Sequence, residues 1–207
     1  MLATRLQNLT LALAIVGLMS GSPVQAQWRL GIEVGAARFW GASRDTVDAN
    51  SSVVPYRPTT FGVSLERQAG KYGFGVQLHY SEASLGLIGP ELQVAAEGAF
   101  TVFSISPEAV VRLATLGAAN ELRLHAGPLF ELWDLVDMDS RARVGAQGSV
   151  SLDVPLGGRF RGAVIAGGAV TPSPYNEGEL DLEDGAPTYK LRTMWRRSFA
   201  VALDYEL

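Results

Sequence analysis

Apolar and polar residues alternate with a period of two along most of the chain after residue 27. The alternation is clearest in 72–81, where every even position is aromatic or aliphatic and every odd position is Gly, Gln, His or Ser. Side chains of a β-strand alternate between the two faces of a sheet, so this period predicts strands with one apolar face. A helix would repeat its apolar positions about every 3.6 residues, and these segments do not.

Eight such segments follow one another. They lie in residues 28–40, 59–67, 72–81, 99–113, 122–133, 141–154, 160–171 and 193–207. The connections after odd-numbered segments are mostly long, at 41–58, 82–98, 134–140 and 172–192, whereas those after even-numbered segments are short, at 68–71, 114–121 and 155–159. Outer-membrane barrels share this arrangement, with short periplasmic turns and longer extracellular loops. The pattern predicts an all-β fold, an eight-stranded antiparallel up-and-down transmembrane β-barrel.

Residues 1–26 have the features of a secretory signal peptide. Arg5 gives a basic start, an apolar run follows from Leu9 to Met19, and Val24-Gln25-Ala26 has the small-x-small form of a cleavage site. The apolar run is too short for a membrane helix, which needs about 20 residues. We expect Sec-type export, cleavage after Ala26, and one barrel domain over residues 27–207.

The polar face of the segments indicates which side of the barrel meets lipid. It carries mainly Gly, Ser and charged residues, and Arg replaces Lys, which occurs only at Lys71 and Lys190. Its charges balance: Arg29, Arg112, Arg123, Arg141, Arg143, Arg161 and Arg196 against Glu33, Glu66, Glu108, Glu131, Asp153, Asp204 and Glu206. Eight strands enclose room only for side chains, and charges taken out of water must be paired. A polar, ion-paired lumen is therefore favoured over a soluble, lipocalin-like barrel with an apolar interior.

Folding the segments about their connections predicts two cross-strand ion pairs in the lumen. Folding the sixth segment onto the seventh places Asp153 opposite Arg161. Folding the fifth onto the sixth places Glu131 opposite Arg143. Directly opposed residues have Cβ atoms about 4.5–5.5 Å apart, which is close enough for a bidentate bridge.

The apolar face has aromatic residues near both ends of the segments, as in the two interfacial girdles of a lipid-facing wall. These are Trp28, Tyr72, Phe160 and Tyr205 at one end, and Trp40, Tyr80 and Trp195 at the other.

Some residues depart from a regular wall. Pro107 and Pro128 predict bulges inside strands, and Arg197 predicts either a side chain that snorkels to the outer interface or a register shift. Glycines also lie on this face at Gly148, Gly162 and Gly168.

Over residues 28–207 the chain resembles the small outer-membrane β-barrel superfamily, of the OmpA transmembrane-domain and OmpX type. The most specific match is the last segment, where apolar residues alternate at Phe199, Val201, Leu203 and Tyr205. In that superfamily the barrel assembly machinery reads a terminal strand that ends in an aromatic residue, whereas here the last residue is Leu207. The resemblance implies a multi-pass location in the outer membrane of a Gram-negative bacterium. It also implies contacts with outer-membrane lipids and lipopolysaccharide, and with the assembly machinery through Trp195–Leu207.

Candidate chemistry is sparse. His79, Ser81 and Glu82 are the residue types of lipid-modifying barrel enzymes, but the alternation turns His79 into the lumen, away from lipid. His79 and His125 lie at different heights along the wall, too far apart to share a metal. Without cysteine, thiolate metal sites and disulfides are excluded. We expect no cofactor and, for want of a basic patch, no nucleic-acid partner.

The long connections are acidic. In the third and fourth of them, Asp137, Asp139, Asp181 and Glu183 are weak candidates for a divalent-cation site, against the simpler interpretation of a solvated acidic loop.

The leading function is a structural or surface-interaction role without catalysis, with a possible extracellular partner. The alternatives are a barrel enzyme acting on lipid or peptide, and a narrow pore.

Overall fold

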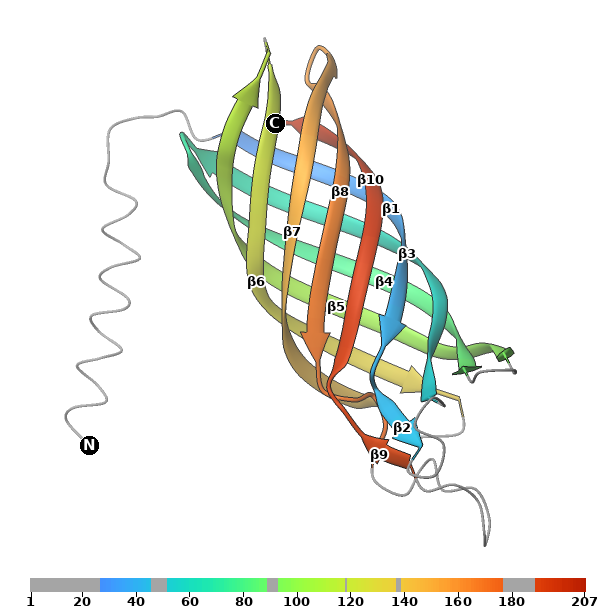
Figure 1. The fold of residues 1–207 in the computed structure, drawn as a ribbon. Coiled ribbons are helices and arrows are strands. Elements are labelled where there is room, and N and C mark those ends of the chain that lie inside the picture. The colour runs from blue at the N-terminus through green and yellow to red at the C-terminus, as the bar shows by residue number, and fades with distance from the viewer. Residues whose placement is uncertain (1–26, 46–51, 89–92, 118, 137–138, 177–188) are drawn as a thin grey trace, which may run out of the picture.

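A computed structural model describes residues 27–45, 52–88, 93–117, 119–136, 139–176 and 189–207. Strands from these residues close into an antiparallel barrel with the order β1-β10-β8-β7-β6-β5-β4-β3 (Figure 1). They are β1 (Gln27–Trp40), β3 (Ser52–Ala69), β4 (Tyr72–Ile88), β5 (Gln93–Leu116), β6 (Asn120–Leu135), β7 (Arg141–Gly157), β8 (Phe160–Thr171) and β10 (Met194–Glu206). The predicted eight-stranded up-and-down barrel is confirmed. The expected signal peptide, residues 1–26, lies outside the described residues.

The two ends of the barrel differ (Figure 1). At the turn end, β3 passes into β4 through Gly70 and Lys71, and Gly70 has a φ of 65°, a conformation that glycine adopts without strain. The C-terminus also lies here, where the backbone N–H of Leu207 donates to the carbonyl of Trp28. At the loop end, the short strands β2 (Ser43–Asp45) and β9 (Tyr189–Leu191) form a separate two-stranded sheet that the sequence did not predict.

Several strands are longer at the loop end than the alternation predicted. The expected connection 41–58 contains the first residues of β3, and the expected connection 82–98 contains the end of β4 and the start of β5. Register shifts between Tyr56 and Thr59 and between Ala83 and Leu85 interrupt the simple alternation in these extensions. Such shifts hide a strand from a period-two pattern, because they change which side chains face inward.

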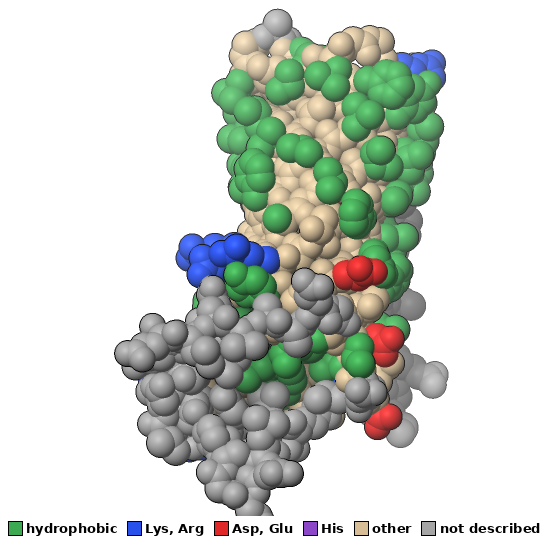
Figure 2. All heavy atoms as spheres, turned by 90° about the vertical axis from the view of Figure 1, so that its right-hand side faces the viewer, with side chains coloured by type: hydrophobic (Ala, Val, Ile, Leu, Met, Phe, Trp, Pro, Cys, Tyr) green, Lys and Arg blue, Asp and Glu red, His purple; other side chains and the backbone are tan. Residues whose placement is uncertain are grey.

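The outer wall of the barrel is apolar. Exposed side chains on it include Ile32, Phe61, Phe74, Val144 and Phe199, each with more than half of its surface accessible. Figure 2 shows hydrophobic side chains as a broad band over one face of the barrel, between the turn end and the loop end. In the part of the chain that the structure describes, no helix has the length and apolar character needed to cross a bilayer.

The bulges predicted at Pro107 and Pro128 are absent. The β5–β6 register is the same on both sides of the prolines, with Ile105 opposite Phe130 and Ala109 opposite Ala126. In this register Pro107 lies opposite Pro128. Because proline has no backbone N–H, both missing donors fall at the same position of the β5–β6 hydrogen-bond ladder. The hydroxyl of Ser106 donates to the carbonyl of Pro128 at 2.7 Å, which satisfies an acceptor left there.

Candidate functional site in the barrel lumen

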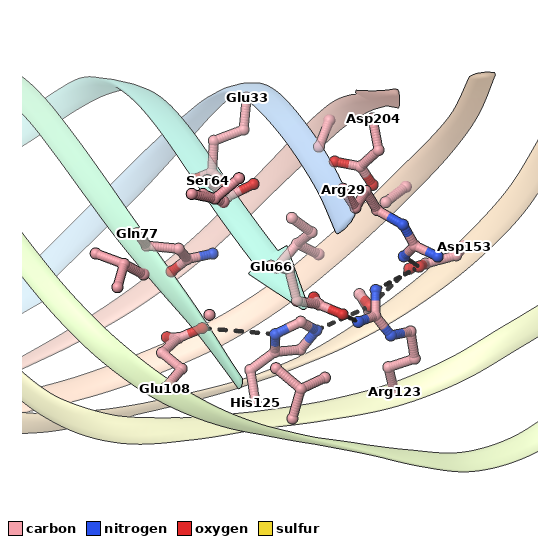
Figure 3. Close-up of a pocket in the computed structure, with 18 residues that line it drawn as sticks. Arg29, Glu33, Ser64, Glu66, Gln77, Glu108, Arg123, His125, Asp153 and Asp204 are labelled. Atoms are coloured by element: carbon pink, nitrogen blue, oxygen red, sulfur yellow. Dashed lines mark hydrogen bonds and ion pairs between the residues drawn. The ribbon is translucent and has the colours of Figure 1, made fainter. Parts of the chain in front are cut away.

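The lumen is centred on Asp153, a β7 carboxylate that is 1% exposed. Its Oδ2 accepts hydrogen bonds from Arg29 and Arg123, both at 2.8 Å, and its Oδ1 accepts one from the hydroxyl of Ser151 at 2.7 Å. Arg123 also pairs with Glu66 on β3. Figure 3 shows Arg29, Glu66, Arg123 and Asp153 pointing toward one another from four different strands. Because charged hydrogen bonds are strongest where water is excluded, this network ties opposite walls of the barrel together.

Nearer the turn end, Glu121 and Glu206 sit among three arginines. Glu121 pairs with Arg112 at 2.9 Å and lies 3.9 Å from Arg29 and 4.0 Å from Arg161. Glu206 lies 3.6 Å from Arg29 and 3.8 Å from Arg161. Glu121 was not among the predicted lumen residues, because the alternation places it in the connection 114–121, whereas β6 begins at Asn120. Its signal was present: Glu121 shares parity with the lumen residues Arg123 and His125.

Toward the loop end, Glu131 is the main buried carboxylate. Its Oε1 accepts from Arg196 at 2.9 Å and its Oε2 accepts from the indole N–H of Trp133 at 3.0 Å. In the same part of the lumen, Gln147 donates to Glu108 at 2.7 Å. The polar side chains at this height therefore join β5, β6, β7 and β10.

Both histidines face the lumen, as their parity predicted. His79 contacts Glu33, and His125 lies 3.5 Å from Glu108 and 3.3 Å from the Ser151 hydroxyl. Glu82 instead points outward, and its carboxylate accepts a hydrogen bond from the Tyr80 hydroxyl. The segment 79–82 therefore does not assemble a His, a Ser and a carboxylate around one reacting point.

The predicted pair of Asp153 with Arg161 is wrong. β7 and β8 are joined by a two-residue turn with a register shift between Pro155 and Gly157, so Asp153 lies opposite Ala163 and Arg161 lies opposite Pro155. Arg161 is thereby moved toward the turn end, where it donates to the carbonyl of Ala119 at 2.9 Å.

For Glu131 and Arg143 the predicted register is correct, because the two residues are cross-strand partners. The predicted ion pair does not form. Glu131 pairs with Arg196, while Arg143 turns to the loop end and donates to the carbonyl of Ser173 at 2.6 Å and to Asn176 Oδ1 at 2.9 Å. Arg141 similarly donates to the carbonyl of Pro174 at 3.1 Å. Arg141 and Arg143, two of the seven arginines predicted to face the lumen, thus hold the segment 173–176 in place.

An apolar cluster closes the lumen at the loop end. This mouth cluster consists of Ala37, Phe39, Ala42, Val53, Val54, Ala83, Phe100, Val102, Trp133, Leu135, Tyr175 and Met194. Trp133 is its centre, with edge-on ring contacts to Phe39 and Phe100 at centroid distances of 6.0 and 6.1 Å. The Tyr175 hydroxyl is buried and has no hydrogen-bond partner among the described residues, and this burial raises the pKa of Tyr175 above its usual value.

Two small cavities lie in the lumen. One lumen cavity beside Asp153 and Asp204 has a volume of about 30 Å³, and a second beside His79 and Arg196 has about 50 Å³. Each volume holds one to a few water molecules. Glycines make room for the charged groups: a Cβ at Gly31 would overlap the Asp204 carboxylate and the Ser64 hydroxyl.

Of the candidate cation ligands in the loops, Asp137, Asp181 and Glu183 lie outside the described residues. Asp139 is exposed, and its carbonyl accepts two hydrogen bonds from the Arg141 guanidinium, at 3.1 and 2.9 Å. Within the described ranges, no group of three or more His, Asp or Glu residues is placed to hold a metal ion. The loop-cation hypothesis therefore remains a prediction.

Comparison with known proteins gives a likeness of fold. No protein-family model matches the sequence, and no curated protein matches it in sequence. The structure is similar to Neisserial surface protein A (NspA), with a TM-score of 0.54 and 9% identity over 87% of this chain and 97% of that chain. It is also similar to the outer membrane protein AlkL, solved in lipid bilayers, with a TM-score of 0.54 and 9% identity over 91% of this chain and 93% of that chain. The chain thus has the fold of the small eight-stranded outer-membrane β-barrels.

Proposed function

We propose that this protein spans the outer membrane of a Gram-negative bacterium as a closed barrel with a structural or surface-interaction role. The observation that carries the proposal is a filled, ion-paired lumen inside a wall whose exposed face is apolar. In water such a wall would expose a contiguous hydrophobic surface far larger than soluble monomers tolerate. In a bilayer the same wall is solvated by acyl chains, and buried carboxylates such as Asp153 and Glu131 are paired with arginines inside the lumen.

The two alternative functions receive less support. A pore needs a continuous water column, whereas this lumen holds cavities of about 30 and 50 Å³ below an apolar mouth cluster. A barrel enzyme acting on lipid or peptide needs a catalytic base at the outer wall or the rim. Both histidines instead contact carboxylates in the lumen. The Glu82 carboxylate, which points outward, accepts a hydrogen bond from the Tyr80 hydroxyl.

The proposed partners follow from the surfaces that the barrel presents. Outer-membrane lipids and lipopolysaccharide would cover the apolar wall, and the loops would be free to meet an extracellular partner. The assembly machinery would bind β10, on which Phe199, Val201 and Leu203 point outward and are 58%, 48% and 41% exposed. Export through the Sec pathway would precede this step.

Fractionation and conductance measurements test the proposal together. Expressed with its first 26 residues, the protein should co-sediment with outer membranes and show heat-modifiable gel mobility. The purified barrel should give no stable unitary conductance in planar bilayers. Recovery as a soluble periplasmic protein would refute the membrane assignment, and steady channels lost on unfolding would favour the pore.

A further inference from the structure

An outward-facing row of four residues crosses β7, β8, β10 and β1 near the loop end. Gly148 pairs with Gly168, Gly168 with Arg197, and Arg197 with Arg38. Both arginine side chains are exposed on the outer wall. The row thus brings together an arginine pair and two glycines on the outer wall of the barrel.

The row lies at the edge of the hydrophobic band. The next outward row toward the loops contains Trp195 opposite Trp40, and the next row toward the turn end is apolar and includes Phe199. Arg38 is ten residues beyond Trp28 on β1 (38 − 28), and a tilted strand crosses a bilayer in about 9–11 residues. Figure 2 shows a group of Lys and Arg side chains where the hydrophobic band gives way to the loops. The arginine pair therefore lies at the depth where acyl chains meet headgroups.

The arginine pair sets two like charges side by side on the outer wall. Like charges directly opposite each other on antiparallel strands repel. Among the described residues, neither Arg38 nor Arg197 has a carboxylate at ion-pair distance, whereas the lumen Arg123 has two. The Arg197 guanidinium is held over the Trp40 ring, 4.8 Å from its centroid. This stacking leaves the guanidinium N–H groups available to an external acceptor.

Beside the arginines the wall is hollowed. A groove of about 450 Å³ is lined by Trp40, Ala146, Gly148, Gly168, Trp195 and Arg197. A Cβ at Gly148 or Gly168 would come no closer than 3.4 Å to its nearest neighbour, so the fold does not require glycine there. This contrasts with Gly31 in the lumen, where a Cβ would overlap charged groups. Because glycine weakens a strand, the two glycines are best explained by the open space above them.

We propose that this groove binds a phosphate-bearing lipid of the leaflet at the loop end. Its phosphate would lie between Arg38 and Arg197, and one acyl chain would lie on the floor formed by Gly148 and Gly168. Guanidinium groups bind phosphate through paired hydrogen bonds, and at this depth water competes weakly for them. The proposal rests on the membrane location proposed above, and it accounts for residues that have no role in a uniformly apolar wall.

Tryptophan quenching by brominated lipids tests the groove directly in the full mature barrel, reconstituted in bilayers. In a Trp28→Phe background, Trp40 and Trp195 are the tryptophans that face lipid, because Trp133 is buried in the mouth cluster. Brominated phosphatidic acid and brominated phosphatidylcholine with identical chains are titrated in separate series. Phosphatidic acid should be favoured at these tryptophans, and each of Arg38→Gln and Arg197→Gln should reduce the preference by about fivefold.

Two matched controls separate the groove from general surface effects. Arg67 stacks on Trp28 at the turn end, 5.6 Å from the ring centroid, so Arg67→Gln in the same background should leave the preference unchanged. Gly168→Leu should fill the groove and weaken quenching, whereas Ala166→Leu, on the same strand and face but outside the groove, should not. Heat-modifiable mobility verifies that each variant is folded.

Equal quenching by the two lipids, or an Arg67→Gln effect as large as that of Arg197→Gln, would overturn the proposal. Because the barrel is inserted in the bilayer beforehand, such a result would leave the membrane location standing. Failure of the membrane location would instead appear in the fractionation experiment.

Discussion

The part of the barrel within the hydrophobic band and the part beyond it at the loop end use opposite face polarities. Near the edge of the band that faces the loop end, the outward row across β4, β5 and β6 is Tyr80, Phe103 and Leu132. Two residues farther along each strand, the outward row is Glu82, Thr101 and Asp134. On these three strands the outer wall therefore changes from apolar to polar within one step of the sheet.

The interior changes in the opposite sense over a similar height. Within the band it holds the ion pairs around Asp153 and Glu131, and beyond the band it holds the apolar mouth cluster. The strands thus continue as one sheet, but their extension is built like a soluble β-barrel, apolar inside and polar outside. The surrounding solvent accounts for the difference. Lipid solvates apolar side chains, so the charged residues lie inside, whereas water solvates polar side chains, so the apolar residues lie inside.

The largest effect should come from breaking the charged part of the lumen. Asp153→Ala leaves Arg29 and Arg123 buried without this shared acceptor, and we expect a loss of about 3–5 kcal/mol in the free energy of unfolding. Urea titration of barrel refolded in lipid vesicles, followed by heat-modifiable mobility, measures it. Glu206→Gln is the matched control, because Glu206 is partly exposed and makes longer contacts, so its loss should stay below about 1 kcal/mol. Equal losses for the two variants would mean that the network is not dehydrated.

A somewhat smaller effect should come from the apolar part. Met194 is 1% exposed in the mouth cluster, and truncating a buried methionine to alanine costs about 3 kcal/mol. Met194→Ala should therefore lower stability in the same urea titration, while Met194→Leu should be tolerated to within about 1.5 kcal/mol. A Met194→Ala variant as stable as the parent would indicate that the extension is loosely packed or open.

The boundary between the two parts should appear as a difference in stability between variants at two neighbouring outward positions of β6. Leu132 and Asp134 are both exposed and outward-facing on β6, two residues apart. Leu132→Asp puts a charge near the edge of the hydrocarbon layer and should cost about 1 kcal/mol, whereas Asp134→Leu should be nearly neutral. The difference should vanish in detergent of short chain length, which does not impose a layer of fixed thickness. The opposite ranking of the two variants would place the membrane boundary elsewhere.

The barrel itself was predictable, because each transmembrane strand faces lipid on one side and the polar lumen on the other, so its residues alternate between apolar and polar. The strand extensions were not, because the reversed polarity and the register shifts near Tyr56 and Ala83 break that alternation. The lengths of the turns correctly predicted that Glu131 lies opposite Arg143. They could not predict the partner of Asp153, because Arg29 is 124 residues away in the sequence and reaches Asp153 across the lumen. In a closed barrel, long side chains reach partners on opposite walls, and such contacts leave no trace in local spacing.

A pair of double-mutant cycles separates opposition in the sheet from contact in the lumen. Glu131 lies opposite Arg143 in the sheet, yet its carboxylate is bonded to Arg196 on β10. The cycle of Glu131→Gln with Arg196→Gln should show a coupling of about 1–3 kcal/mol, because both partners are buried and each single change strands the other. The cycle of Glu131→Gln with Arg143→Gln should be additive to within about 0.5 kcal/mol, since Arg143 holds the carbonyl of Ser173 instead. Strong coupling in the second cycle together with additivity in the first would show that sheet register alone selects the ion pairs, as sequence analysis assumed.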